Sequence, residues 1–558
     1  MDKSSVFKPR FFEAVKQYNA SLFAADAMAG IIVGIVALPL AIAFAIASGV
    51  APEVGLITAI IGGFIVAMFG GSSVQIGGPT GAFIIIVYGI IQEFGIQGLL
   101  VATFIAGLLL LVMGVLKLGS LIKFIPYPIV IGFTAGIALT IFSTQMNDLL
   151  GLGLKGMPAA FIPKWGMVLE NMDKFNWIAL VIGIVSITII QVTPRFTKKI
   201  PGSLIAIILM TVVVYWLRTY QGVQGIETIG DRFTISASIS MPDMPQLGWT
   251  QIQQLITPAF TIAMLGAIES LLSASVADGV TGDRHDSNTE LIAQGLANIA
   301  VPFVGGIPVT GAIARTMTNI NNGGKTPVAG VIHALILLLI FLFLGPLTAY
   351  IPMACLSGVL IVVSYNMSGW RSVRSLFKGP KSDTAVMMIT FLLTVLVDLT
   401  VAIEIGLIFS MLFFMKRMVE STNILVSKDV LELHREGDDV AKGKQVLELP
   451  HGVEVYEIEG PYFFGIANRF DEAMREAGDR AGVRIIRMRF VPFMDSTAIH
   501  NLKTLCRTCQ SEGVKLIFSG VNDKVRQSLE QTGVADMVGR QFICRDINEA
   551  VEVARTIV

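Results

Sequence analysis

Charged residues are scarce in this sequence of 558 residues: they make up 15% of it, whereas an ordinary soluble domain carries about a quarter. This shortage argues against a soluble cytoplasmic enzyme. Neither sign of charge is in excess, with 41 basic and 41 acidic residues, so nothing indicates a surface for nucleic acid. Four cysteines exclude a disulfide scaffold. No GxxxxGK[ST] loop is present, so an ATP-driven pump is unsupported.

Apolar residues are abundant instead, at 53% of the chain, and they are concentrated between residues 24 and 420. A membrane-spanning helix needs about 20 mostly apolar residues. Fourteen candidate segments begin near residues 27, 53, 79, 98, 126, 176, 203, 258, 291, 310, 327, 347, 384 and 401. The sequence therefore predicts an all-α polytopic membrane domain at 24–420. A short segment at 1–23 precedes it, and a small α/β domain at 421–558 follows it.

Basic residues in the loops indicate the orientation. Eleven lysines and arginines lie in the loops on the side of the N-terminus, and five lie in the loops on the other side. By the positive-inside rule, the N-terminal segment and the C-terminal domain are then cytoplasmic. Residues 1–23 lack the apolar core and cleavage site of a signal peptide.

A short motif repeats at a fixed offset of 230 residues. Thr80–Ala82 recurs as Thr310–Ala312, and Gly49–Val50 recurs as Gly279–Val280. Both Thr-Gly-Ala motifs open segments that are too short to span, the third and the tenth, and each follows a stretch rich in glycine and proline. Because seven helices separate the copies and seven is odd, the second group crosses the membrane with opposite polarity. The pattern predicts a 7+7 inverted repeat, which is typical of secondary transporters.

The two short helices then meet with their N-termini near the middle of the membrane. Each N-terminus carries about half a positive charge and unpaired N–H groups, so together they form a site for an anion. Small residues at Gly81, Ala82, Gly311 and Ala312 let an anion approach the backbone closely. The alternative is that these glycines only permit close helix packing.

Two charged residues stand out within the apolar segments. Arg315 lies in the tenth segment and would add positive potential beside the anion. Glu269 lies in the eighth, where it would bind a coupling proton or, together with Ser273 one turn later, a sodium ion. The alternative is a Glu269–Arg315 salt bridge without a role in coupling. Phe44 and Phe83 are candidates for the wall of the cavity.

These residues together resemble the sulfate permease (SulP) family of anion transporters. The resemblance covers nearly the whole chain and rests on the segments GIVALPLAIAFAIASGVAPEVGL (34–56), GGPTGAF (77–83), LGAIESLLSA (265–274), NTELIAQGLANI (288–299) and GAIARTMTNINNGGKTP (311–327). The chain is most similar to bacterial C4-dicarboxylate transporters of the DauA type, and its LGAIESLLSA and GGKTP stretches are also similar to sodium-dependent bicarbonate transporters of the BicA type. The resemblance implies a core and a gate that move as an elevator, and a homodimer.

The resemblance also implies roles for individual positions. The positions implied for the anion site are Thr80, Gly81, Ala82, Phe83, Gly311, Ala312, Ile313, Ala314 and Arg315. Glu269 and Ser273 match the positions of cation coupling in the bicarbonate type. The chain departs from sulfate-type members at Leu40, where they often carry glutamine, and at Ala314, where several members carry serine. Both departures predict a less polar pocket.

The C-terminal domain has three strand-like runs at 453–460, 483–491 and 514–520. The segment VPFMDSTAIHNL resembles the signature of the STAS domain, which implies a cytoplasmic protein partner. Ser496 matches a phosphorylated position of soluble relatives of that domain. The alternative is that Asp495 or Ser496 only caps a helix. Cys506 and Cys509 form a lone CxxC without further zinc ligands, and we interpret them as ordinary thiols.

The sequence thus predicts a transporter rather than an enzyme, placed in a bacterial inner membrane. We expect secondary active uptake of bicarbonate, a C4-dicarboxylate or sulfate by symport with Na⁺ or H⁺. No resident cofactor is expected, apart from Na⁺ as a coupling ion at Glu269 and Ser273. Alternatives are an anion channel or exchanger, a nucleobase permease of the same architecture, and a membrane-anchored signalling scaffold.

Overall fold

The computed structural model describes residues 7–16, 18–120, 126–196, 201–223, 225–233, 242, 248–397, 399–428, 430–433, 445–466, 470, 474 and 481–558. Two compact units divide the chain, Met1–Ser410 and Met411–Val558, and each is described by itself.

The described residues of the first half of the membrane unit form eight α-helices. Its elements are α1 (Arg10–Lys16), α2 (Ala20–Ala47), α3 (Pro52–Phe69), β1 (Gly77–Gly78), η1 (Gly81–Phe83), α4 (Ile84–Val115), α5 (Tyr127–Leu149), α6 (Phe161–Glu170), η3 (Met172–Lys174), α7 (Trp177–Phe196) and α8 (Gly202–Tyr220). Helix α4 is not continuous, because Gly95 has φ of 69° and ψ of −174° and divides it into two parts.

The second half follows the same plan. Its elements are α9 (Ile229–Arg232), α10 (Trp249–Thr281), α11 (Ser287–Ala300), η4 (Val301–Val304), β2 (Thr310–Gly311), α12 (Ile313–Asn321), α13 (Val328–Leu344), η5 (Gly345–Tyr350), α14 (Met353–Met367), α15 (Trp370–Leu376), α16 (Lys381–Leu396) and α17 (Leu399–Ser421). All fourteen predicted segments are helical. Among the described residues, nine helices are long and apolar enough to cross a membrane. The tenth segment is short as predicted, because α12 has nine residues.

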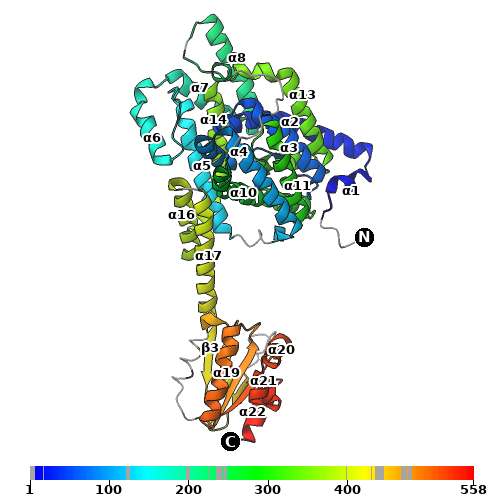
Figure 1. Ribbon diagram of the computed structural model, residues 1–558, viewed down its shortest axis with the longest axis vertical. Coiled ribbons are helices and arrows are strands. Elements are labelled where there is room, and N and C mark those ends of the chain that lie inside the picture. Colours follow the sequence, from blue (N-terminus) through cyan, green and yellow to red (C-terminus); the bar gives the residue numbers. More distant parts are fainter. Residues whose placement is uncertain are drawn as a thin grey trace. The chain divides into compact units, whose positions relative to one another are not determined.

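Helix packing in the two halves is related by symmetry. Each helix pair has a counterpart when the halves are exchanged. The pair α2 and α13 corresponds to α10 and α4, and the pair α3 and α13 corresponds to α11 and α4. The pair α5 and α16 corresponds to α14 and α7. A two-fold axis that exchanges the halves produces this set of pairs, so the inverted repeat is confirmed. We call α2, α3, α4, α10, α11, α12 and α13 the core bundle, and α5, α7, α8, α14 and α16 the gate bundle (Figure 1).

Helices of the core bundle approach one another closely where both carry glycine. A Cβ atom at Gly107 on α4 would lie 2.7 Å from the backbone nitrogen of Ile299 on α11. A Cβ at Gly295 on α11 would lie 2.6 Å from the backbone nitrogen of Leu111 on α4. Small residues thus hold the two helices together by backbone contact, because hydrophobic attraction between helices is weak in lipid.

The C-terminal unit is built on a five-stranded sheet. Its elements are β3 (Asn423–Ser427), β4 (Val430–Leu433), β5 (Gln445–Glu448), β6 (Val453–Glu459), β7 (Val483–Phe490), α19 (Ser496–Ser511), β8 (Lys515–Ser519), α20 (Asp523–Gln531), α21 (Val534–Val538), η6 (Arg540–Phe542), β9 (Ile543–Cys544) and α22 (Ile547–Arg555). The strand order is β3-β6-β7-β8-β9, in which β6 to β9 are parallel and β3 is antiparallel. The predicted runs at 453–460, 483–491 and 514–520 are β6, β7 and β8.

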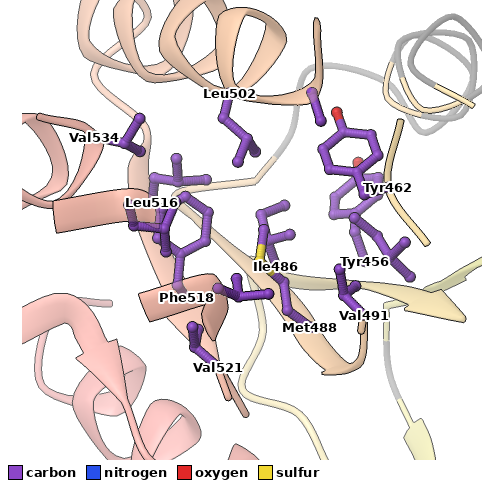
Figure 2. Close-up of a cluster of buried hydrophobic side chains, with 14 of the residues drawn as sticks. Tyr456, Tyr462, Ile486, Met488, Val491, Leu502, Leu516, Phe518, Val521 and Val534 are labelled. Carbon is purple, nitrogen blue, oxygen red and sulfur yellow. The ribbon is translucent and has the colours of Figure 1, made fainter. Parts of the chain in front are cut away.

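Apolar side chains cover both faces of this sheet. Figure 2 shows the larger cluster, in which Tyr456, Ile486 and Phe518 from three strands meet Leu502 of α19 and Val534 of α21. Alternate residues of the same strands pack on the other face with α22. Apolar residues alternate or follow one another along these three strands, which is why they were recognised from the sequence.

The two thiols of the CxxC motif belong to the first of these clusters. Cys506 and Cys509 are 2% and 1% exposed. Burial raises the pKa of Cys506 to about 11, which disfavours the reactive thiolate.

We predict that Gly107→Ala destabilises the membrane unit. The added methyl group would clash with the α11 backbone, and overpacking of this kind costs about 1–3 kcal/mol. Gly89→Ala is the matched control, because a Cβ at Gly89 on the same helix meets nothing within 4 Å. Thermal unfolding in detergent should show a lower midpoint for Gly107→Ala only. Equal midpoints for the two variants would contradict the packing described above.

Candidate functional site

Two short strands, β1 and β2, pair where the halves of the membrane unit meet, and we call this strand pair the crossing. β1 pairs antiparallel with β2, with Gly77 opposite Gly311 and Gly78 opposite Thr310. Helix η1–α4 begins directly after β1, and α12 begins directly after β2. Because the strands are antiparallel, the two helices leave the crossing in opposite directions, and their N-termini lie at its two ends. The first N–H groups of each helix have no partner within the helix, which leaves them available to an anion.

A cavity of about 370 Å³ lies at this crossing, between the core bundle and the gate bundle. We call it the central cavity. The core bundle contributes Leu40, Phe44, Thr80, Gly81, Ile268, Glu269, Leu272, Gly311, Ala312, Ile313, Ala314 and Arg315. The structure thus brings most of the predicted site residues to one cavity.

Two predicted anion-site residues do not line that cavity among the described residues. Ala82 and Phe83 are 0% and 1% exposed and lie behind it. The ring of Phe83 faces α10 instead, where a Cβ at Gly266 would lie 3.5 Å from its Cζ. The structure therefore differs from the wall position expected for Phe83, because η1 turns this side chain into the core bundle.

Sequence reasoning did not identify the gate-bundle side of the cavity. Phe133 and Thr134 of α5 and Val363, Asn366 and Met367 of α14 line it. Apolar residues on all sides of a membrane helix do not reveal which face meets a cavity. Asn366, a polar side chain near the end of an apolar helix, is the one signal that could have pointed to this wall.

Glu269 contacts the first short helix directly. Thr80 Oγ1 donates a hydrogen bond of 2.7 Å to Glu269 Oε2. Thr80 also precedes the first residue of η1, so the carboxylate of α10 is linked to the start of that helix. The structure does not show the alternative salt bridge, because among the described residues no Glu269–Arg315 pair lies within 4.0 Å.

Arg315 connects the two halves. Its side chain is 1% exposed, and its Nη2 donates to the carbonyl oxygen of Pro79, which lies between β1 and η1. Nη1 has no hydrogen-bond partner within the described structure. This guanidinium lies against Gly78, whose φ of 151° and missing side chain leave room for it. A buried guanidinium nitrogen without a partner beside a cavity is suited to an anion.

Among the described residues, Ser273 makes no hydrogen bond to Glu269. It is 1% exposed, and its Oγ lies 3.3 Å from Thr316 Oγ1 on α12, which in turn accepts a hydrogen bond of 3.1 Å from the Ile76 nitrogen. The hydroxyl beside Glu269 is therefore that of Thr80. The structure differs in this respect from the expected pairing of Glu269 with Ser273.

Two buried polar residues on α11 bind the chain segments that lead into β1 and β2. We call these segments the approaches to the short helices. Glu290 is 0% exposed and accepts hydrogen bonds from the Gly71 nitrogen at 2.9 Å, from Gln75 Nε2 at 2.8 Å and from Gln294 Nε2 at 2.9 Å. Asn298 Nδ2 donates a hydrogen bond of 2.8 Å to the Val309 carbonyl oxygen, and Asn298 Oδ1 accepts one of 2.9 Å from the Val309 nitrogen. Polar residues within an apolar helix were the available signal for both.

In the C-terminal unit, Asp495 caps α19. Its Oδ1 accepts from the Ala498 nitrogen at 2.8 Å, and its Oδ2 accepts from the Phe464 nitrogen at 3.0 Å. Ser496 is the first residue of the helix and is exposed. The capping interpretation therefore holds for Asp495, and the hydroxyl of Ser496 stays accessible.

Comparison with known proteins gives consistent matches. The profile described as "Sulfate permease family" matches residues 23–390, and that of the "STAS domain" matches residues 444–550. The putative sulfate transporter YvdB of Bacillus subtilis is 38% identical over 534 residues, which cover 95% of this chain and 98% of that protein. The bicarbonate transporter BicA of Picosynechococcus is 30% identical over 520 residues, which cover 91% and 90%.

Solved structures agree with this result. The transmembrane domain of a cyanobacterial bicarbonate transporter BicA is 29% identical, with a TM-score of 0.62 over 69% of this chain and 98% of that one. Murine Slc26a9 in an inward-facing state has a TM-score of 0.85 at 17% identity, with 100% of this chain and 96% of that chain covered. The second comparison shows a shared fold.

We predict that Glu290→Gln destabilises the membrane unit by about 1–3 kcal/mol. An amide would turn an N–H group toward donors that now meet a carboxylate, so at least one buried donor would lose its partner. Glu93→Gln, at an exposed residue of α4, is the control. Thermal unfolding in detergent measures both variants. An unchanged midpoint for Glu290→Gln would show that the carboxylate does not hold the approach to η1.

Proposed function

The chain belongs to the sulfate permease family of multi-pass anion transporters, and we propose that it performs secondary active uptake of a small oxyanion through the central cavity. One observation carries this proposal: the starts of two oppositely directed short helices and the buried guanidinium of Arg315 surround the same cavity. Bicarbonate, sulfate and a C4-dicarboxylate are the candidate substrates.

Backbone N–H groups and Arg315 supply complementary parts of the anion site. The helix starts provide about half a positive charge each, and their donors are fixed before the anion arrives. Arg315 provides a full charge with a free Nη1. Leu272, Leu40 and Phe44 make the remaining wall apolar, which excludes water and strengthens these interactions. Such a site recognises charge and size more than the identity of the acid.

We propose that Glu269 binds the coupling cation, either H⁺ or Na⁺. The Thr80 hydroxyl donates to this carboxylate and also lies at the start of η1. When a cation occupies Glu269, the carboxylate charge facing the cavity is neutralised, and an anion no longer meets repulsion there. Cation and anion then favour each other's binding, which is the requirement for symport.

The position of the cavity supports an elevator mechanism. All of the proposed binding groups belong to the core bundle, whereas α5 and α14 of the gate bundle supply the opposite wall. Movement of the core bundle along the gate bundle would carry the anion from one side of the membrane to the other without dismantling the site. We also propose a homodimer in a bacterial inner membrane with cytoplasmic termini, and a cytoplasmic protein partner for the C-terminal domain at Ser496.

The test of the whole proposal is uptake into proteoliposomes. Labelled bicarbonate, sulfate, succinate and fumarate are supplied separately, with Na⁺ and H⁺ gradients imposed one at a time. Accumulation of one anion against its gradient identifies the substrate and the coupling ion. Chloride conductance without accumulation of any of the four would overturn the proposal in favour of a channel.

We predict that Glu269→Gln abolishes accumulation driven by a cation gradient, while exchange of anion across the membrane persists. Glutamine still accepts from Thr80 but neither ionises nor binds a cation by charge. Glu170→Gln, at an exposed residue of α6, is the control and should accumulate anion normally. Gradient-driven accumulation by Glu269→Gln would rule out the proposed coupling site.

We predict that Arg315→Gln raises the KM for the transported anion about 10- to 100-fold, because a hydrogen bond to a charged group contributes about 1.5–3 kcal/mol. Arg371→Gln removes an exposed arginine and should leave the KM unchanged. Initial rates of uptake at varied anion concentration measure the effect. A wild-type KM for Arg315→Gln is the outcome that removes Arg315 from the site.

A further inference from the structure

A second, smaller cavity lies between the same two bundles. Its volume is about 160 Å³, and we call it the distal cavity. Its polar lining residues include Gln145, Asn147, Asp148, Lys164 and Arg232. Polar and apolar groups share this lining, unlike the largely apolar wall of the central cavity.

The two cavities follow one another along the boundary between the bundles. On α5 the central cavity meets Phe133 and Thr134, whereas the distal cavity begins at Thr144. On α14, which runs the opposite way, the central cavity meets Val363 to Met367 and the distal cavity meets Met353 to Leu360. The distal cavity is therefore displaced toward the end of the bundles that is remote from the start of α2.

Apolar side chains surround the start of η1 beside the central cavity. A Cβ atom at Gly81 would lie 3.0 Å from Met367 Sδ, 3.4 Å from Ile141 Cδ1 and 3.5 Å from Phe44 Cε1. These three side chains from α14, α5 and α2 converge on the start of η1.

Lys164 is the exceptional residue of the distal cavity. It lies on α6, between the spanning helices α5 and α7, and it is 2% exposed. No hydrogen bond or ion pair of its ammonium group is found in the described part of the chain. Burial lowers the pKa of Lys164 to about 8, because the charged ammonium group loses its hydration there.

The other charged groups of the lining are already paired. Arg232 Nη2 lies 2.7 Å from Asp148 Oδ1 and 2.5 Å from Glu227 Oε2. Glu227 lines a separate, acidic cavity of about 320 Å³ on the other side of this pair. Arg232 thus contacts both Asp148 and Glu227, whereas the ammonium group of Lys164 has no partner in the described structure.

We propose that the distal cavity is a second anion site, in which Lys164 binds the oxyanion beside Arg232 before it enters the central cavity. The identity of this anion rests on the proposed function, but the site itself rests on a buried, unpaired ammonium group that lines a polar cavity. An oxyanion there would supply the missing partner of Lys164, and the cavity volume suits a species with few heavy atoms.

Transport measured separately from the two faces tests this site. Right-side-out and inside-out vesicles from an expressing bacterium are supplied with ³⁵S-sulfate and with ¹⁴C-bicarbonate. Lys164→Gln should raise the KM about tenfold from the face on which the distal cavity opens, and leave it unchanged from the other. Lys164→Arg should stay near wild type. Lys155→Gln, at an exposed lysine of the same loop, is the matched control.

A binding measurement separates failure of this site from failure of the proposed function. Sulfate should still raise the thermal midpoint of Arg315→Gln in detergent, and it should lose this effect in Arg315→Gln/Lys164→Gln. Lys164→Met replaces Lys164→Gln if the latter does not reach the membrane. Equal KM changes from both faces, or identical sulfate effects with and without Lys164, overturn the distal site. Wild-type vesicles that transport none of bicarbonate, sulfate, succinate and fumarate, together with stabilisation that depends on Lys164, overturn the proposed function only.

Discussion

The structure depends on one constraint, the satisfaction of backbone polar groups at membrane depth. Hydrocarbon offers no hydrogen-bond partner, so irregular backbone persists there only where protein supplies one. The β1–β2 crossing meets this requirement by pairing the two broken segments with each other, and Glu290 and Asn298 meet it for the approaches. Arg315 adds a bond to the Pro79 carbonyl across the crossing. The helix starts that these contacts hold in place are then the groups left free for a ligand.

The sequence made much of this architecture predictable. Length and apolarity identified all fourteen helices, and the Thr-Gly-Ala repeat at an offset of 230 residues identified the inverted symmetry. Most positions placed at the anion site line one cavity, because residues around a helix start are local in sequence. Phe83 and Ser273 were placed less well, since the direction of a side chain on a helix inside a bundle depends on neighbours far along the chain. Glu290, Asn298 and the gate-bundle wall were missed for the same reason: their partners lie on other helices.

Charge is used sparingly in the membrane unit, and its distribution separates two tasks. Groups with partners, such as Glu290, hold the backbone, and a fully satisfied carboxylate of this kind rigidifies its surroundings. Arg315 lines the central cavity, and its buried Nη1 has no hydrogen-bond partner in the described structure. Glu269 is intermediate, because it has one hydroxyl partner and also lines the central cavity.

The antiparallel pairing of β1 with β2 has a consequence for the origin of the fold. Each strand comes from a different half, so a chain of half this length would expose the edge of its single strand and leave the N–H and C=O groups unpaired. Such a chain could complete the crossing only with a second copy inserted in the membrane upside down. An ancestor of this kind would have been a dual-topology dimer, and fusion of its two genes would have fixed the opposed orientations in one polypeptide.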